Sequence, residues 1–475
     1  MVYFILREWL VMTPLILHHL AIGFVLGFPA ILTPAITTTS HVTDIHATKN
    51  DASTITAAYG MTGCIGFLIV PPLMQIYGRK ITSIFLNTAV LCGFVIIAVS
   101  PNVITLIIGR AVQGISFGGL YISSILASEY SHPKRRGFFV IFKITASCIG
   151  VLICHSCGFL TSWRNIAWMS SIPPTLAILA TTMLPESPLW LAFKGRYEES
   201  ITAFEWIRGK DKLAQKELKE LLTAQYELRR IRNSRESVLS RIKKAITSKE
   251  FLKPFLIVTE LLTLSQMCGR YYFIAYVIQI MTQLTGDETK AFYYTVTLDL
   301  MKIFAVLLSS YIVQLFNRRL LLFFSGSLSC FLLAVVCVIQ YLDWKFSINL
   351  GWSTPALLVV YDFVCNAGVI PLSILLKGEM FPLQYKGIGI CASGVLNALI
   401  SMITLKLTSP MLDALKVHGT FSVYMSVAVI LLVHLYFILP ETKDRTLQDI
   451  ENGFVAIKIS KDAQEVTNKL LNRDN

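Results

Sequence analysis

The chain has 475 residues, of which 54% are hydrophobic and 15% are charged, and its formal net charge is +13. Soluble globular domains average about 45–50% apolar and about 25% charged residues, so this composition excludes an ordinary soluble enzyme. The positive charge does not indicate nucleic-acid binding, because the Lys and Arg residues stand in short clusters between long apolar runs rather than in one basic patch. Apolar runs of about 18 residues or more can cross the hydrocarbon of a bilayer, and they predict a polytopic membrane protein.

Twelve apolar runs bounded by charged or turn residues are predicted to be membrane-spanning helices. In chain order they lie near residues 9–36, 52–76, 81–99, 103–129, 137–161, 165–184, 253–284, 289–316, 320–341, 352–378, 387–414 and 419–439. Because a charged stretch separates the first six from the last six, the predicted fold is an all-α membrane protein of two pseudo-symmetric six-helix halves. The predicted divisions are an N-terminal half at 1–184, a cytoplasmic helical linker at 185–252, a C-terminal half at 253–439 and a cytoplasmic tail at 440–475.

The distribution of Lys and Arg orients these helices. Basic clusters follow the second, fourth, eighth and tenth runs and recur in the linker, whereas the loops on the other side carry single basic residues. By the positive-inside rule, both termini and the linker are predicted to be cytoplasmic. Acidic and basic residues alternate along 194–250 with leucines at helical spacing, which predicts short amphipathic helices or, as the alternative, a solvated linker with partial helicity.

The ten cysteines all fall within apolar runs, so no disulfide framework is predicted. Cys154-His155-Ser156-Cys157 has the spacing of a redox or metal motif, but it lies inside a predicted span without a second Cys/His pair, which favours packing. No nucleophile–base or metal constellation stands at the end of a span, so we expect no enzymatic activity and no cofactor. The expected partners are a small solute and the lipid bilayer, with no nucleic acid, and the chain is expected to function as a monomer.

Paired motifs at the ends of corresponding runs indicate that the two halves are duplicates of one six-helix unit. Three motif pairs recur in the same order, each at the predicted cytoplasmic end of its run. They are Gly78-Arg79-Lys80 with Asn317-Arg318-Arg319, Glu129…Gly137 with Glu379…Gly387, and Pro185-Glu186-Ser187 with Pro440-Glu441-Thr442.

The Pro-Glu motifs resemble the signatures of the sugar porter branch of the major facilitator superfamily. The residues that carry this resemblance are Pro185-Glu186-Ser187-Pro188-Leu189-Trp190, Pro440-Glu441-Thr442-Lys443, and Gly109-Arg110 with Gly114 and Gly118. The Gly- and Phe-rich stretch at 23–30 is similar to that of insect facilitated trehalose transporters. The resemblance covers nearly the whole chain and implies the major facilitator fold with sugar transport by alternating access.

The resemblance also implies a charged cytoplasmic gate. In the family, acidic residues at the ends of spans face basic residues in adjoining loops, and such an ion-pair network between the halves can hold the cytoplasmic side closed. The matching residues here are Arg79, Glu129, Arg136, Glu186, Arg318, Arg319, Glu379, Lys386 and Glu441. The alternative is that these charges only snorkel to the membrane interface. Gln75 and Gln314 stand where the family has Asp, so a looser gate is expected.

The substrate site that the resemblance implies is only partly kept. Neutral sugars are bound by amides, which offer paired donors and acceptors, and by aromatic rings, which offer an apolar face. The predicted substrate-binding residues are Gln266, Tyr271, Tyr272, Lys302 and Asn397. At other family positions, Ile144 replaces a glutamine, Lys302 replaces an asparagine and Ile374 replaces a tryptophan.

Ionisable residues inside predicted spans are functional candidates, because charge within a membrane is costly. Asp299 and Lys302 lie three residues apart on one helical face, and Arg270 and Lys143 are near the same depth. One hypothesis is that Lys302 and Arg270 contact a charged or acidic-sugar substrate. The other is that Asp299 and Lys302 neutralise each other as an intrahelical pair. For His18-His19, a structural role is favoured over a titrating one.

Val25 occupies the position at which proton-coupled sugar porters carry an acid, which favours uniport. The leading hypothesis is therefore facilitative transport of a sugar, with trehalose or glucose as first candidates, in the plasma membrane. The alternatives are a carrier of a charged organic solute or acidic sugar, and a non-transporting receptor that senses sugar.

Overall fold

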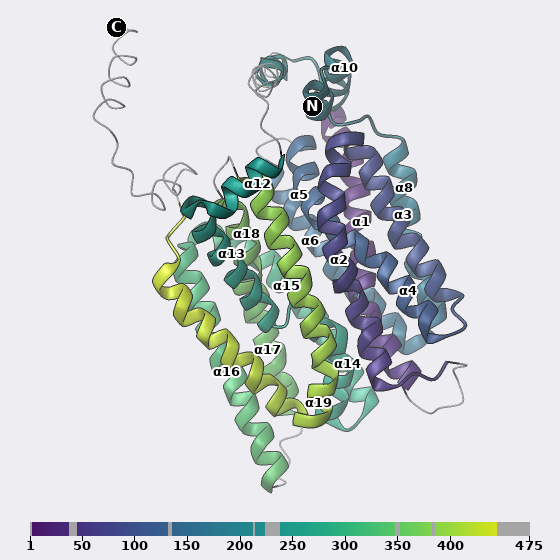
Figure 1. The fold of residues 1–475 in the computed structure, drawn as a ribbon. Helices are drawn as coiled ribbons and strands as arrows, with labels where there is room; N and C mark the ends of the chain where they lie inside the picture. Colours follow the sequence, from purple (N-terminus) through teal and green to yellow (C-terminus); the bar gives the residue numbers. More distant parts are fainter. Residues whose placement is uncertain are drawn as a thin grey trace.

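The structure is a computed structural model that describes residues 2–37, 45–131, 135–211, 214–223, 238–346, 352–381 and 385–443. Within these residues the secondary structure is helical and contains no β-strand. The long helices run side by side, with α10 and α12 at one end of the bundle and the bend of α19 at the opposite end (Figure 1). We call the end that carries α10 and α12 the linker end, and the opposite end the far end.

The N-terminal half begins with three long helices, and its later spans include broken ones. The helices are α1 (Val2–Thr37), α2 (Lys49–Tyr77), α3 (Arg79–Ala98), α4 (Val103–Gly114), the 3₁₀ turn η1 (Ile115–Gly118), α5 (Gly119–Tyr130), α6 (Arg136–Leu160), α7 (Trp163–Ser170) and α8 (Ile172–Thr182). The predicted fourth span is thus divided among α4, η1 and α5, and the predicted sixth span between α7 and α8.

Short helices follow in the linker, as the alternating charges predict. They are α9 (Pro188–Lys194), α10 (Tyr197–Arg208), a helical stretch at 214–223 and α12 (Val238–Thr247). On α10 the buried residues Ser200, Ala203, Phe204 and Ile207 recur every three or four positions, which is the spacing of one helical face. The basic run at 229–232 lies outside the described residues.

The C-terminal half repeats the pattern of long helices and mid-span breaks. Its helices are α13 (Lys249–Met267), α14 (Tyr272–Thr285), α15 (Glu288–Leu315), α16 (Arg318–Phe346), α17 (Ser353–Ala367), α18 (Val369–Met380) and α19 (Lys386–Ile438). Two predicted spans fall within α19, which is interrupted at Lys416 by a non-helical backbone with φ 57° and ψ −174°.

Nine helical segments of the described chain are long and apolar enough to cross a membrane. Large apolar side chains such as Leu160, Met183 and Phe437 are exposed along them, and each of these three is more than three-quarters exposed. Soluble monomers rarely expose extended apolar surface, so lipid is the expected neighbour of these side chains. The predicted all-helical membrane fold is confirmed, whereas the count of twelve spans and the four divisions of the chain stay predictions.

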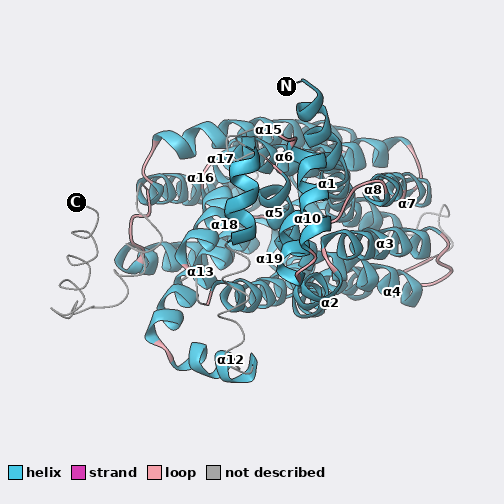
Figure 2. Cartoon of the chain, turned by 90° about the horizontal axis from the view of Figure 1, so that it is seen from above, coloured by secondary structure: helices cyan, strands magenta, loops and turns pink. Residues whose placement is uncertain are grey.

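The helices of the two halves lie on opposite sides of the bundle when it is viewed from the linker end (Figure 2). Across the boundary, α2 packs on α19, α6 on α15, and α1 on α14. Gly60 allows α2 and α19 to approach closely, because a Cβ atom there would lie 2.7 Å from the backbone nitrogen of Met402. At the far end the same two helices are joined by the Lys49–Asp413 ion pair, at 2.9 Å.

The breaks in two spans bring loop-like backbone to the middle of the bundle. The turn between α13 and α14 contains Gly269 at φ +93°, a conformation that side-chain-bearing residues rarely adopt. In the other half, η1 interrupts the fourth span at Ile115–Gly118. Irregular backbone inside a membrane protein is tolerated where it lines a site or is buried in protein. The residues at these two breaks are therefore candidates for a binding site.

Candidate functional site

At the linker end of the N-terminal half, three predicted gate residues form one buried cluster. Arg79 makes a two-pronged ion pair with Glu129, with Nη2 2.6 Å from Oε1 and Nε 2.9 Å from Oε2. The Ser187 hydroxyl donates to the same carboxylate at 2.5 Å. Glu186 accepts from the backbone N–H groups of Arg79 and Lys80, at 2.9 and 3.1 Å, and thereby caps α3. Burial raises the pKa of the Glu186 carboxyl, and these N–H groups oppose that shift.

The C-terminal half repeats the cap but not the ion pair. Glu441 accepts from the backbone N–H groups of Arg318 and Arg319, at 3.2 and 3.1 Å, and Thr442 donates to Glu379 at 2.7 Å. Within the described chain no ion pair joins Arg318 to Glu379, and the buried Nε of Arg318 has no hydrogen-bond partner there. The duplicated motifs therefore build equivalent backbone contacts, whereas within the described residues only the first-half motifs form a buried ion pair.

The expected ion-pair network between the halves stays a prediction. Every gate contact just described stays within its own half, because each acid reaches the loop or helix that its own repeat supplies. The side chain of Arg136 lies outside the described residues. Lys386 begins α19 and is half-buried. Charged contacts between the halves occur instead at the far end, where Lys406 donates to the carbonyl and side-chain oxygens of Asn50, at 3.0 and 2.8 Å.

Two of the predicted substrate-binding residues meet in the middle of the bundle. The Gln266 amide on α13 donates to the side-chain oxygen of Asn397 at 2.9 Å and to the Ser401 hydroxyl at 2.8 Å, both on α19. The Gln266 side-chain oxygen is buried and has no hydrogen-bond partner within the described residues. A buried acceptor of this kind is costly unless something else satisfies it. The Gln266–Asn397 pair therefore leaves the side-chain oxygen of Gln266 as an acceptor that a solute can use.

The predicted residue Tyr271 joins the two halves through aromatic contacts. It follows the break in span seven, and its ring centroid lies 5.5 Å from that of Phe117 in the break of span four. Phe117 also contacts Tyr59 at 5.2 Å and Phe67 at 5.8 Å. These four residues, Tyr59, Phe67, Phe117 and Tyr271, are called the central aromatic cluster below. The adjacent Tyr272 lies apart from it, stacked at 4.4 Å on Tyr424 within the C-terminal half.

The charged residues of span eight pair with other helices rather than with each other. Lys302 Nζ lies 3.6 Å from the Asp362 carboxylate on α17, and Asp299 is 2.7 Å from Nδ1 of His155 on α6. The hypothesis of an Asp299–Lys302 pair within one helix is thus wrong. Because Asp362 lies against Lys302, Lys302 is not the unopposed anion contact that the alternative hypothesis requires.

Three further cations face rings of the central aromatic cluster. The guanidinium carbon of Arg270 lies 5.0 Å from the Tyr271 centroid, and that of Arg110 lies 5.4 Å from the Tyr59 centroid. Lys377 Nζ lies 5.5 Å from the Phe67 centroid. Such placements over ring faces are attractive, by about 0.5–2 kcal/mol each. The middle of the bundle is therefore amide-bearing, aromatic and electropositive.

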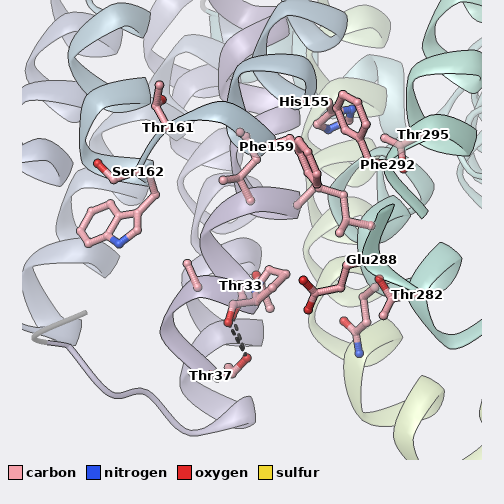
Figure 3. A pocket seen from close by; sticks show the side chains of 18 of the residues that line it. Thr33, Thr37, His155, Phe159, Thr161, Ser162, Thr282, Glu288, Phe292 and Thr295 are labelled. Carbon is pink, nitrogen blue, oxygen red and sulfur yellow. Dashed lines mark hydrogen bonds between the residues drawn. The ribbon is translucent and has the colours of Figure 1, made fainter. Parts of the chain in front are cut away.

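A cavity of about 960 Å³ lies at the far end, between the two halves. Its walls come from α1 and α6 on one side and from α14 and α15 on the other (Figure 3). His155 reaches this cavity with the side chain that also pairs with Asp299.

Comparison with known proteins shows which family the chain belongs to. Residues 11–454 match the model of a family described as "Sugar (and other) transporter". The chain belongs to this sugar transporter family. The resemblance to sugar porters that the Pro-Glu motifs indicate is thereby confirmed.

Individual relatives are similar to the chain along most of its length. It is 26% identical over 441 residues to a facilitated trehalose transporter, Tret1, of Aedes aegypti, covering 90% of this chain and 53% of the relative. It is 25% identical to Tret1 of Culex quinquefasciatus, covering 90% of this chain and 83% of the relative. The chain thus spans about half the length of the Aedes aegypti protein.

Solved structures support the fold of the chain. The inward open conformation of the xylose transporter XylE from E. coli matches with a TM-score of 0.74 at 17% identity, covering 94% of this chain and 99% of that one. XylE bound to 6-bromo-6-deoxy-D-glucose matches with a TM-score of 0.71 at 19% identity, covering 94% and 99%.

Sequence reasoning missed two residues of this transporter's buried charge network, His155 and Asp362. His155 is interpreted from the sequence as part of a packing motif, yet its ring is buried and bonded to Asp299 in the other half. Asp362 does not enter the sequence interpretation at all. The available signal is simple: each is an ionisable residue inside an apolar span, where charge is costly unless it is paired.

Proposed function

We propose that this protein is a facilitative carrier that moves a neutral sugar across a membrane by alternating access, with trehalose and glucose as first candidates. The observation that carries the proposal is the meeting of Gln266, Asn397 and Ser401 beside the central aromatic cluster. Amide and hydroxyl groups match the donors and acceptors of a sugar, and aromatic rings match its apolar faces. The trehalose-transporter names of the relatives support the same substrate class.

The proposal includes an orientation and a location. The linker end, with its basic residues, faces the cytoplasm, and the far end faces the outside. The protein acts as a monomer in the plasma membrane.

Uptake into proteoliposomes tests the proposed function. Wild-type protein is expected to take up radiolabelled trehalose or glucose faster than empty liposomes, and Gln266→Ala is expected to lower this uptake about tenfold, because a buried amide hydrogen-bond set is lost. Gln340→Ala is the matched control, since Gln340 is bonded to Thr354 on neighbouring α17 at 3.0 Å, away from the Gln266 site. Equal uptake with and without wild-type protein for every sugar would contradict the proposal.

Uniport is the proposed transport mode, and Arg110 supports it. The Arg110 guanidinium donates to the backbone oxygen of Val25 and to the side-chain oxygen of Gln113, both at 2.8 Å. Arg110 therefore contacts an uncharged residue, Val25, at the position where proton-coupled sugar porters carry an acid.

Sugar uptake by this protein is therefore expected to be insensitive to an imposed proton gradient or its collapse by a protonophore, because no carboxyl group at position 25 can take up the proton. The measurement compares initial uptake rates with and without the gradient. XylE, described as a proton:xylose symporter, is the positive control in the same liposomes. Gradient-driven accumulation of sugar above the external concentration would refute uniport.

An acidic sugar or another organic anion is the second candidate substrate, and Arg270 and Lys377 favour it. Both cations face aromatic rings of the central cluster, and within the described chain neither forms an ion pair with a carboxylate. The uptake panel therefore includes glucuronate beside glucose. Uptake of glucuronate in preference to glucose would support this candidate over a neutral sugar.

A further inference from the structure

The far-end cavity is built by both halves of the transporter and is open to the far end. Its volume is about 960 Å³, within the range of about 300–1,000 Å³ that is typical of small-molecule sites. Rim residues Thr161, Ser162, Gln283 and Glu288 are exposed, so a solute reaches the cavity from that side. Figure 3 shows its side chains arranged around a common space.

Two buried polar atoms of this cavity lack hydrogen-bond partners. His155 is only 1% exposed, and its Nε2 has no partner within the described residues, whereas its Nδ1 is bonded to Asp299. The side-chain oxygen of Gln279 is likewise buried and unpartnered. Buried polar atoms are nearly always satisfied in proteins, so two of them in one cavity indicate a ligand or water that supplies the missing bonds.

The remaining lining suits a molecule with many hydroxyl groups and apolar ring faces. Phe159 of α6 and Phe292 of α15 stack across the boundary between the halves, with centroids 4.3 Å apart and planes 21° apart. Hydroxyl-bearing residues surround them, including Thr33, Thr282 and Thr295 (Figure 3). Aromatic faces beside hydroxyl and amide groups offer a sugar both kinds of contact that it makes.

We propose that the far-end cavity is a second sugar-binding site, separate from the Gln266–Asn397 site, at which the solute docks before the path to the middle of the bundle opens. This inference rests on the proposed function. His155 lines the cavity, and its contact with Asp299 ties α6 to α15 across the halves. The docked solute therefore lies on one side of this pair, and the central aromatic cluster lies deeper in the bundle.

Protection of an introduced cysteine from a membrane-impermeant maleimide tests the second site. Thr282→Cys places a thiol on the cavity wall, and Lys290→Cys places one on the exposed surface nearby, outside the cavity. The wild-type chain gives the background from its ten native cysteines. Trehalose is expected to slow labelling of Thr282→Cys several-fold and to leave Lys290→Cys unchanged, while glycine at equal osmolality protects neither.

Adding either of two substitutions to the Thr282→Cys chain shows at which site the protecting sugar is bound. Gln266→Ala is expected to leave protection unchanged, because that amide belongs to the central site. Gln279→Ala is expected to raise the half-protecting trehalose concentration about 2- to 10-fold, the effect of one lost buried hydrogen bond. Unchanged labelling of Lys290→Cys in the Gln279→Ala chain verifies that this substitution leaves the far end folded.

The outcomes separate the second site from the proposed function. Sugar uptake by the wild type without protection of Thr282→Cys, or protection that disappears with Gln266→Ala, overturns the second site and leaves the transport proposal standing. Protection without uptake overturns the transport proposal and supports the second site. The absence of both uptake and protection overturns both.

Discussion

Asp362→Asn is expected to destabilise the folded protein by about 3–5 kcal/mol, because it leaves the buried ammonium group of Lys302 without its counter-charge. Lys302 and Asp362 are 6% and 3% exposed, and their charged atoms are 3.6 Å apart. Within a membrane protein such a charge has little access to water, so the loss is expected at the upper end of the range for single substitutions. Thermal unfolding of the detergent-solubilised protein, followed by size-exclusion chromatography, measures it.

Removing both charges is expected to restore most of the lost stability. The double substitution Lys302→Met with Asp362→Leu replaces the buried pair by apolar side chains of similar size, a change that is often neutral or stabilising. Asp413→Asn is the matched control, because its partner Lys49 is 69% exposed and such a surface pair contributes about 0–1 kcal/mol. Unfolding of Asp362→Asn at the wild-type temperature would show that Lys302 is solvated or otherwise partnered.

The same pair bears on the choice of substrate. A lysine in span eight at the position of a sugar-binding asparagine suggests an anionic solute when it is seen in the sequence alone. The structure places Asp362 of span ten against it, so the pair as a whole is neutral. Electropositive character in the middle of the bundle then depends on Arg110, Arg270 and Lys377, which is why glucuronate uptake is the sharper test of an anionic substrate.

The helices and their duplication could be predicted from the sequence, because both depend on local patterns. Apolar runs of spanning length give α1, α2, α3 and α6 nearly at their predicted positions. The matched motifs likewise predict that Glu186 and Glu441 occupy equivalent places, and each caps the start of one helix in its own half, α3 and α16 respectively. The break at η1 is not evident in hydropathy, because the residues around it remain apolar, whereas the break at Gly269 is followed directly by Arg270.

The pairing of buried charges could not be predicted in the same way. Spacing along a helix suggests that Asp299 and Lys302 meet, since residues three apart share a face. Which helix lies opposite that face is a property of the assembled bundle: α6 supplies His155 and α17 supplies Asp362. The partners of the gate charges could not be predicted for a related reason, since the sequence shows which charges stand at span ends but not which partner each one reaches.

The Arg79–Glu129 ion pair of the first half has no counterpart at Arg318 and Glu379 within the described residues, so substitutions at Glu129 and Glu379 are expected to affect stability unequally. Glu129→Ala is expected to destabilise the protein by about 3–5 kcal/mol, because it strands the buried guanidinium of Arg79 and removes the acceptor of Ser187. Its counterpart Glu379→Ala removes one hydrogen bond from Thr442, which contributes about 0.5–1.5 kcal/mol. Thermal unfolding of the two variants, measured side by side, makes each the control for the other.

A double-mutant cycle separates the ion pair from the general cost of truncating a buried side chain. If Arg79 and Glu129 stabilise one half together, then Arg79→Ala in the Glu129→Ala background should cost much less than Arg79→Ala alone. The same cycle on Arg318 and Glu379 should give a coupling close to zero, since no ion pair joins them in the described chain. Equal coupling in both halves would contradict the asymmetry. A loss of transport without any loss of stability in Glu129→Ala would instead favour a latch between the halves, because a contact that forms in one conformation only shifts the balance between conformations.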